Sequence, residues 1–229
     1  KKGLKKEIKS DNTPVTNGDI EVNNILTKKI STLTPEIPII SEETSSNKKN
    51  ENLNNFWLID PIDGTSSYIN NKDEFTINAA LIINKKPVLG VINAPDKKRL
   101  FYSYAPSNSF EIVNNQEINL INQKKKNINL ITAVSYSNEL KPDILKLHKE
   151  FKVNKYQKMK SSLKFCVIAA GEFDLYIAEP RAYEWDIAAG HAILEHAGGT
   201  LKDFNGNEIE YGKADFKNPS LILRGKHIS

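Results

Sequence analysis

Cysteine is almost absent from this 229-residue sequence, in which Cys166 is the only one. A single cysteine excludes an internal disulfide and any metal centre built from several thiolates, and it fits a reducing cytosol. Its neighbours Phe165, Val167 and Ile168 indicate a buried apolar position, where a nucleophilic thiolate is disfavoured. We therefore expect an activity that does not depend on a cysteine thiol.

Long apolar runs and a strong charge bias are absent as well. A membrane-spanning helix needs about 20 consecutive apolar residues, so we expect no integral membrane association. The 32 basic and 28 acidic residues leave a formal charge of only +4. The one tight basic run, residues 124–126, has no interleaved aromatic residues and is interpreted as a solvated loop that binds no nucleic acid polymer. We expect a cytoplasmic protein, with peripheral attachment to the inner membrane as the alternative.

The predicted elements divide the chain into an N-terminal α+β half, residues 1–130, and a C-terminal α/β half, residues 131–229. In the first half a helix begins near residues 17–19, and short strands with Asn-rich turns are typical of an antiparallel meander. In the second half strands and helices alternate. The expected strands are residues 37–40, 56–59, 75–83, 88–92, 100–104, 110–113, 118–121, 131–135, 175–178 and 221–223. The later expected helices are residues 142–151, 161–170 and 186–197.

Two carboxylates follow a predicted buried strand in the segment Asp60-Pro61-Ile62-Asp63-Gly64-Thr65. Proline has no N–H to donate to a neighbouring strand, so we expect strand pairing to stop at Pro61. Gly64 permits backbone angles that other residues avoid, and Thr65 then begins a short capped helix. A helix N-terminus beside two carboxylates predicts a phosphate held next to divalent cations.

A further carboxylate comes from Trp185-Asp186-Ile187-Ala188-Ala189-Gly190-His191. Asp186 precedes a run of good helix formers, so it is predicted to be the N-cap, and a purely structural cap is the alternative. Asp60, Asp63 and Glu42 also lie at the ends of predicted elements. Hard divalent cations bind oxygen ligands, and magnesium commonly bridges carboxylates to a substrate phosphate. Together the four carboxylates indicate a site for several magnesium ions.

The histidines argue against a zinc site. On a helix with 3.6 residues per turn, His191 lies about 140° around the axis from Asp186, and His196 lies about 15 Å along it. Neither can share a metal with Asp186 on a regular helix. Both are interpreted as ordinary helix residues.

In their order along the chain, Glu42-Glu43 and the two aspartate motifs resemble those of the inositol monophosphatase superfamily, which contains magnesium-dependent, lithium-sensitive phosphomonoesterases. Within it the chain is most similar to the 3'(2'),5'-bisphosphate nucleotidases of the CysQ type. The segments that carry this closer resemblance are Lys9-Ser10-Asp11-Asn12-Thr13-Pro14-Val15-Thr16, Ser161-Ser162-Leu163-Lys164-Phe165-Cys166, Tyr211-Gly212-Lys213 and Asn218-Pro219.

This resemblance implies a layered αβαβα sandwich of the sugar-phosphatase type and a small phosphorylated substrate. The expected reaction removes the 3'-phosphate of adenosine 3',5'-bisphosphate, a by-product of sulfate activation, to give AMP. Inositol-1-phosphate or fructose-1,6-bisphosphate hydrolysis is the alternative, and an inactive phosphate-binding regulatory protein is another. The family normally carries a further helix before residue 9, so either the chain is truncated or its N-terminal packing differs. A monomer or a homodimer is expected.

The resemblance also implies roles for individual residues at the reaction centre. Two or three Mg²⁺ ions would be held by Glu42, Asp60, Asp63, Asp186 and the main-chain carbonyl of Ile62. Glu42 is preferred to Glu43 because adjacent strand residues point to opposite faces, and it is counted among the catalytic groups together with Asp19 and Thr65. Asp19 would pair with the Thr65 hydroxyl to orient the attacking water, with no covalent intermediate. The N–H groups of Gly64 and Thr65 would hold the phosphate.

Substrate contacts are expected from a second group of residues. Ser161, Ser162 and Lys164 at a helix start would bind a second phosphate, and the alternative is an N-capped helix with a solvent-facing lysine. Arg181 would hold phosphate or base through its planar guanidinium. Glu179 stands where inositol phosphatases place a hydroxyl-binding carboxylate, which keeps the inositol alternative open.

Overall fold

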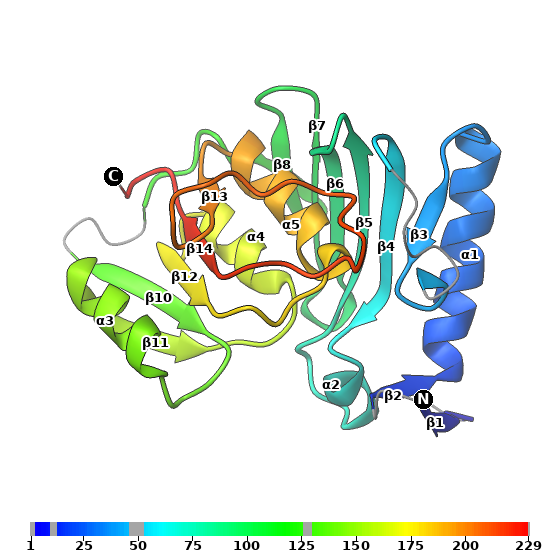
Figure 1. Cartoon of the computed structure of the whole chain (residues 1–229), viewed down its shortest axis with the longest axis horizontal. Coiled ribbons are helices and arrows are strands. Elements are labelled where there is room, and N and C mark those ends of the chain that lie inside the picture. Colours follow the sequence, from blue (N-terminus) through cyan, green and yellow to red (C-terminus); the bar gives the residue numbers. More distant parts are fainter. Residues whose placement is uncertain (1–2, 10–12, 46–52, 126–129, 229) are drawn as a thin grey trace.

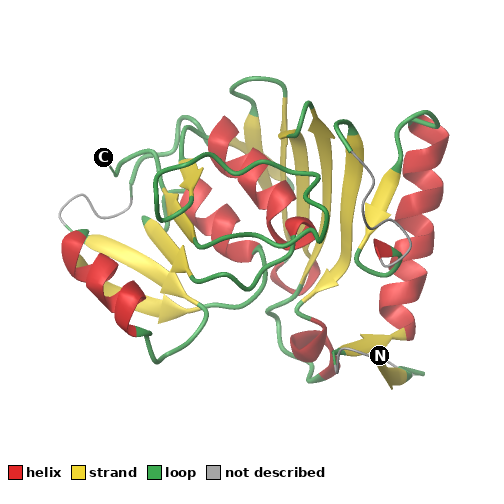
Figure 2. Ribbon diagram, viewed as in Figure 1, coloured by secondary structure: helices red, strands yellow, loops and turns green. Residues whose placement is uncertain are grey.

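The computed structural model describes residues 3–9, 13–45, 53–125 and 130–228. It has five layers, in which two β-sheets alternate with helices (Figure 1). Helix α1 (Asn17–Leu33) covers the outer face of one sheet and α3 (Pro142–Glu150) covers the outer face of the other. Helices α4 (Leu163–Ala169) and α5 (Glu184–His196) lie between the sheets (Figure 2). This arrangement confirms the expected αβαβα sandwich.

The larger sheet has seven strands in the order β3-β4-β5-β6-β7-β8-β9. Only β3 and β4 pair in parallel, so the predicted antiparallel meander is confirmed from β4 onwards. Asn84 and Lys85 join β5 to β6 with positive φ angles of 49° and 63°, as a tight mirror-image hairpin turn requires. The strands are β3 (Ile39–Ser41), β4 (Phe56–Asp63), β5 (Thr76–Ile83), β6 (Lys86–Ala94), β7 (Arg99–Tyr104), β8 (Ser109–Val113) and β9 (Gln116–Asn119).

The smaller sheet has five strands in the order β11-β10-β12-β14-β13. Strand β10 (Ile131–Ser135) is parallel to both neighbours, β11 (Val153–Lys158) and β12 (Leu175–Ala178). Strands β14 (Leu221–Arg224) and β13 (Thr200–Lys202) complete it in antiparallel orientation. The sequence did not predict β11, because this edge strand is polar and lysine-rich and lacks an apolar alternation.

The remaining elements are short. Strands β1 (Lys6–Ile8) and β2 (Pro14–Thr16) form an unpredicted hairpin before α1. Helix α2 (Thr65–Ile69) follows β4, and a 3₁₀ turn (Pro95–Lys97) joins β6 to β7. Among the helices that the structure describes, none combines the length and apolar character needed to cross a membrane.

Helix α5 is buried along most of its length and packs on the larger sheet. Small residues allow this close approach. A Cβ atom at Gly90 would lie 2.3 Å from the carbonyl oxygen of Ala189, and one at Gly190 would lie 2.4 Å from the Phe165 ring. Because such contacts are far below van der Waals separation, glycine is needed at both positions. The packing places the N-terminus of α5, and therefore Asp186, beside the end of β4.

Candidate active site

Strand pairing does not stop at Pro61, contrary to the sequence prediction. Strand β4 continues to Asp63, and its pairing with β5 is interrupted after Asp60 and resumes where Asp63 faces Thr76. This irregularity accommodates a proline that cannot donate to the ladder. In a regular strand, residues three apart point to opposite faces. The bulge instead brings Asp60 and Asp63 to one place.

Asp186 joins these two carboxylates from the start of α5. It is the third residue of the helix and not its N-cap, because α5 begins two residues earlier than predicted. Its Oδ2 accepts a hydrogen bond of 2.7 Å from the N–H of Tyr183, the actual N-cap. One carboxylate oxygen from each of Asp60, Asp63 and Asp186 lies within 4.8 Å of the others. We call these three residues the acidic cluster.

The acidic cluster fits a divalent cation. Burial, followed by repulsion from neighbouring carboxylates, raises the pKa of Asp60 well above its ordinary value and raises the pKa of Asp186 to about 8. Burial also raises the pKa of Asp63. Oδ1 of Asp60 is buried without a hydrogen-bond partner among the described residues. Buried like charges with an unpaired acceptor oxygen are costly unless a cation balances them, so this donor set can hold a metal.

Glu42 lies beside the acidic cluster but not within the group of three. Its negative charge is, after burial, the next cause of the raised pKa of Asp60. Glu42 and Glu43 follow β3 in a turn, so the strand alternation used to choose between them does not apply. Both accept from Nζ of Lys9, at 3.1 and 2.8 Å. Residues 10–12 of the Lys9 motif lie outside the described residues.

The turn after β4 links the acidic cluster to α1. Gly64 has φ 90°, and a Cβ atom there would lie 2.8 Å from the Glu74 carbonyl, so glycine is needed. Helix α2 has no side-chain cap, contrary to the prediction, because Gly64 occupies the N-cap position. The Thr65 hydroxyl instead lies 3.2 Å from Oδ1 of Asp19 and 3.1 Å from the carbonyl oxygen of Ile62. Four residues predicted for one site are thus neighbours.

Lys164 is buried, so the solvent-facing alternative is wrong. Its Nζ donates to the carbonyl of Ser161 and lies 5.3 Å from the centroid of the Tyr176 ring. Burial lowers the pKa of Lys164 to about 8, and the negative charge of Asp63 opposes this shift. Helix α4 begins after Ser162, later than predicted, and the side chain of Ser162 does not cap it.

Two adjoining hollows lie at the site, and two residues of the acidic cluster line the smaller one. The smaller, about 80 Å³, brings Asp63 and Asp186 together with Ser161, Ser162, Lys164 and Arg181. The larger, about 420 Å³, shares Arg181 with it and also contains Glu179. The predicted substrate residues are therefore neighbours of the predicted metal ligands.

Aromatic residues at these hollows were not predicted. The Arg181 guanidinium carbon lies 3.3 Å from the centroid of the Tyr136 ring. Tyr176 lines both hollows and lies beneath Lys164. Neither tyrosine stands in a motif, and only the fold brings them to the site. Also in the larger hollow, Glu179 forms an ion pair with Lys141.

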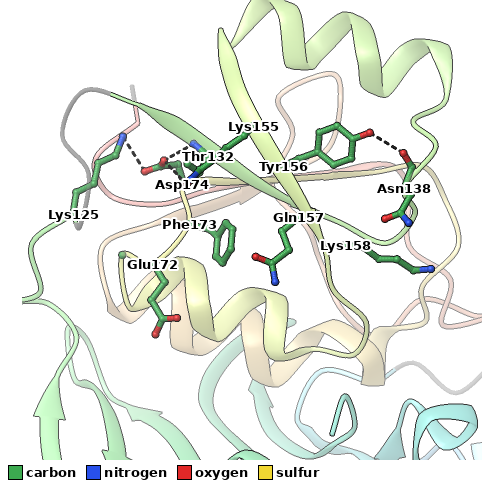
Figure 3. Close-up of a pocket in the computed structure, with 11 residues that line it drawn as sticks. Lys125, Thr132, Asn138, Lys155, Tyr156, Gln157, Lys158, Glu172, Phe173 and Asp174 are labelled. Atoms are coloured by element: carbon green, nitrogen blue, oxygen red, sulfur yellow. Dashed lines mark hydrogen bonds and ion pairs between the residues drawn. The ribbon is translucent and has the colours of Figure 1, made fainter. Parts of the chain in front are cut away.

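Another hollow, of about 670 Å³, lies along β10 and β11 beside residues 171–174 (Figure 3). None of the acidic cluster lines it. Its Asp174 is already paired, at 3.1 Å with Nζ of Lys125 and at 2.8 Å with the N–H of Thr132. Lys125 therefore does not belong to a fully solvated loop, as the sequence suggested, and Lys126 lies outside the described residues. We do not place the reaction in this hollow.

Comparison with known proteins adds a family and a fold. Residues 1–227 match the family model described as "Inositol monophosphatase family". The 3'(2'),5'-bisphosphate nucleotidase CysQ of Buchnera aphidicola is 40% identical over 210 residues, which cover 89% of this chain and 76% of that protein. The protein of the same name from Escherichia coli K12 is 34% identical over 217 residues, covering 93% and 86%.

Solved structures are similar over comparable lengths. CysQ from Bacteroides thetaiotaomicron, described as a bacterial member of the inositol monophosphatase family, is 29% identical with a TM-score of 0.70, covering 87% of this chain and 82% of that one. An IMPase/NADP phosphatase complexed with Mg²⁺ and phosphate has a TM-score of 0.81 at 21% identity, covering 99% and 83%. At that identity the second likeness concerns the fold alone.

Proposed function

The chain belongs to the inositol monophosphatase family, and on this premise we propose that it removes the 3'-phosphate of adenosine 3',5'-bisphosphate to give AMP and phosphate. The observation that carries the proposal is the acidic cluster, whose carboxylate oxygens lie within 4.8 Å of one another, beside the cationic side chains of Lys164 and Arg181. Anionic ligands for metal and cationic groups for phosphate meet at one place. The printed names of the curated relatives support the choice of substrate.

Magnesium is the ion that we propose for this site, as two or three ions. The ligands would be the carboxylates of Glu42, Asp60, Asp63 and Asp186 and the carbonyl of Ile62, which are all the hard oxygen donors that Mg²⁺ prefers. When bound, such ions would supply Lewis-acid stabilisation of the charge on the phosphate oxygens and on the attacking and leaving oxygens.

The residues of the turn after β4 would orient the nucleophile and hold the phosphate. A Thr65 hydroxyl that donates to Asp19 keeps its own lone pairs as acceptors, so it can accept a hydrogen bond from the attacking water and fix that water's orientation. Asp19 holds the hydroxyl in this direction. The N–H groups of Gly64 and Thr65, at the uncapped start of α2, would bind phosphate oxygens. Residues at a helix start are suited to this because their N–H groups have no partner inside the helix.

Lys164, Ser161 and Arg181 would recognise the part of the substrate that carries the second phosphate. Lys164 and Arg181 reach the small hollow from different elements, so they present two cations to one anionic ligand. Inositol-1-phosphate lacks this second phosphate. Glu179, whose carboxylate would favour a polyol hydroxyl, is paired with Lys141, which gives the inositol alternative less support.

An inactive phosphate-binding protein would be expected to lose part of the reaction centre. Here Glu42, Asp60, Asp63, Thr65 and Asp186 are all present, and the proximity of the three aspartate carboxylates supports an intact reaction centre. An active enzyme is therefore the better interpretation. The oligomeric state, monomer or homodimer, and the cytoplasmic location stay predictions of the sequence.

Phosphate release from a panel of substrates would test the proposal. The panel contains adenosine 3',5'-bisphosphate, inositol-1-phosphate and fructose-1,6-bisphosphate, each with Mg²⁺ and with a chelator. We expect the highest kcat/KM with the first, with AMP as the nucleotide product and no release in the chelator. A higher kcat/KM with another compound of the panel would make that compound the proposed substrate. If no compound released phosphate, the inactive phosphate-binding protein would be supported.

A further inference from the structure

Ser162 directs its hydroxyl into the protein, towards strand β5. Its Oγ lies 2.8 Å from Oδ1 of Asn78 and 2.8 Å from Oγ1 of Thr76. All three residues are buried, with exposed fractions of 2% or less. We call Thr76, Asn78 and Ser162 the hydroxyl–amide network. It joins the seven-stranded sheet to the turn that precedes α4.

The direction of these hydrogen bonds follows from proton counting. A serine hydroxyl has one proton, and Ser162 donates it to the Asn78 carbonyl oxygen. The remaining contact must then be donated by Thr76 to Ser162. The hydroxyl of Ser162 therefore has its proton and one acceptor position in use within the protein, and little capacity is left for a substrate phosphate.

The main-chain N–H of Ser162 has a different partner, because it donates to Oδ2 of Asp63. Asp63 is also tied to the network through the sheet, where it faces Thr76 in the β4–β5 ladder, and Asp60 faces Asn78. Thr76 and Asn78 therefore pair with two members of the acidic cluster. They also hold the turn at Ser162, whose N–H donates to Asp63.

The backbone at this turn is constrained. Ser161 has φ 57°, a left-handed conformation that residues other than glycine seldom adopt. Its carbonyl accepts from Nζ of Lys164. Such conformations persist where the surroundings enforce them, and here the lysine on one side and the hydroxyl–amide network on the other do so. The result is that the Ser162 N–H is aimed at a carboxylate that belongs to a different half of the chain.

We propose that Ser162 is a positioning residue for Asp63 and not a contact of the substrate phosphate. The assignment rests on the proposed metal site, and it differs from the role that the sequence suggested for Ser162. A carboxylate held by a fixed N–H donor keeps one orientation, so its other oxygen can serve a cation without reorganisation. Groups that orient a metal ligand in this way commonly affect metal affinity or activity by about 10-fold to 100-fold.

Two variants remove the network without touching the acidic cluster. Ser162→Ala deletes the central hydroxyl, and Thr76→Val deletes the outer donor while keeping the side-chain shape. The first readout is the half-saturating Mg²⁺ concentration, obtained without substrate from the dependence of Tm on Mg²⁺ concentration. The second is kcat and KM for adenosine 3',5'-bisphosphate at saturating Mg²⁺. Ser103→Ala is the matched control. Ser103 is a buried serine of the seven-stranded sheet, and its hydroxyl has no partner among the described residues.

We expect Ser162→Ala and Thr76→Val each to raise the half-saturating Mg²⁺ concentration, by about tenfold for the first, with KM nearly unchanged. Their double variant should be little weaker than Ser162→Ala alone, because both changes act through one network. Thr76→Ser, which keeps the donor, should restore the wild-type value, and Ser103→Ala should not change it.

A rise in KM with unchanged Mg²⁺ affinity in Ser162→Ala would overturn the proposal and return Ser162 to the substrate. Additive effects of the two changes would contradict a shared network. If Ser162→Ala does not fold, the comparison of Thr76→Val with Thr76→Ser decides in its place. Because the Mg²⁺ titration needs no turnover, it gives a result even if the protein hydrolyses none of the substrates, and so separates this proposal from the proposed function.

Discussion

The hydroxyl of Thr65 lies 3.2 Å from Oδ1 of Asp19, and the two residues are 46 positions apart in the sequence. The other carboxylate oxygen of Asp19 accepts from Thr16, at 2.8 Å from its N–H and 2.5 Å from its hydroxyl. Asp19 is therefore both part of the capping box of α1 and the partner of the residue that begins α2. This double use fixes the Asp19 carboxylate, and with it the direction of the Thr65 hydroxyl.

Thr65→Ala should lower kcat by about 10²–10³-fold, the usual loss when a preorganised polar group at the reaction centre is removed. KM should change little, because the hydroxyl is proposed to orient the water and not the substrate. Steady-state phosphate release at saturating Mg²⁺ measures both parameters. Ser66→Ala, which alters the exposed next residue of α2, is the control. If Thr65→Ala raised KM and left kcat at the wild-type value, Thr65 would be assigned to substrate binding.

Asp186→Asn should nearly abolish turnover while the fold remains intact. The amide oxygen can still accept from the Tyr183 N–H, so the helix cap survives, but the acidic cluster loses one negative charge. Without metal the variant should melt at a higher temperature than the wild type, because burial and the nearby Asp63 make the charged carboxylate unfavourable. Circular dichroism melts in chelator and a phosphate-release assay measure the two effects. Wild-type rates would show that Asp186 is only a structural cap.

Magnesium should increase stability more at higher pH. The pKa of Asp186 in the folded state is raised to about 8 by burial and by Asp63, from an ordinary value near 4. Between these values the metal-free folded protein holds protons that the unfolded chain has released, so its stability falls as the pH rises. A bound cation removes this loss. The Mg²⁺-induced increase in Tm should therefore grow from about pH 5.5 to about pH 8, and a constant increase would contradict a cation at the acidic cluster.

Calcium should substitute poorly for magnesium, and lithium should inhibit. Calcium has longer bonds and a looser geometry than the octahedral magnesium ion, so it should hold the reacting groups less well. Lithium inhibition follows from the family resemblance. Turnover in Mg²⁺, in Ca²⁺, in chelator, and in Mg²⁺ with added LiCl tests each statement. Equal rates in chelator and in Mg²⁺ would end the metal hypothesis.

The sequence predicted the parts of this protein whose signals are local. Helix α1 follows from apolar periodicity, the meander from β4 onwards from short apolar runs between turn residues, and β12 from one short apolar run, and the family resemblance is confirmed. The bulge after Asp60 could not be predicted, because Pro61 only shows that one ladder donor is missing and not where pairing resumes. The strand alternation used for Glu42 and Glu43 failed because β3 ends at Ser41. The halves on either side of residue 130 stay a prediction about folding units, since α5 of the second half packs on the sheet of the first.

The surroundings of the acidic cluster depend on contacts between distant segments. No pattern near Lys164 distinguishes a solvated lysine from a buried one, because its burial results from Tyr176 and from the turn at Ser161. Tyr136 contacts Arg181 only because the parallel strands β10 and β12 are paired, so the segments that follow them begin side by side. The roles of the predicted site residues stay predictions, although the structure brings these residues together.

Lys164 should discriminate between adenosine 3',5'-bisphosphate and inositol-1-phosphate. Lys164→Met keeps most of the side-chain volume and removes the charge. If Lys164 binds the second phosphate, KM for adenosine 3',5'-bisphosphate should rise by about tenfold to a hundredfold, since a charge-assisted contact contributes roughly 1.5–3 kcal/mol. KM for inositol-1-phosphate should change little, and kcat should be retained for both if the contact is equal in ground and transition states.

The control for Lys164→Met is Lys158→Met, which alters an exposed lysine of β11 and should leave both substrates unaffected. Equal losses with the two substrates would mean that Lys164 acts through the reacting phosphate or through Asp63, whose charge acts on the Lys164 ammonium group. In that case the Mg²⁺ titration of the variant distinguishes the two routes, because only a disturbed Asp63 would change metal affinity. Either result would remove Lys164 as a reason to prefer a bisphosphate nucleotide over an inositol phosphate.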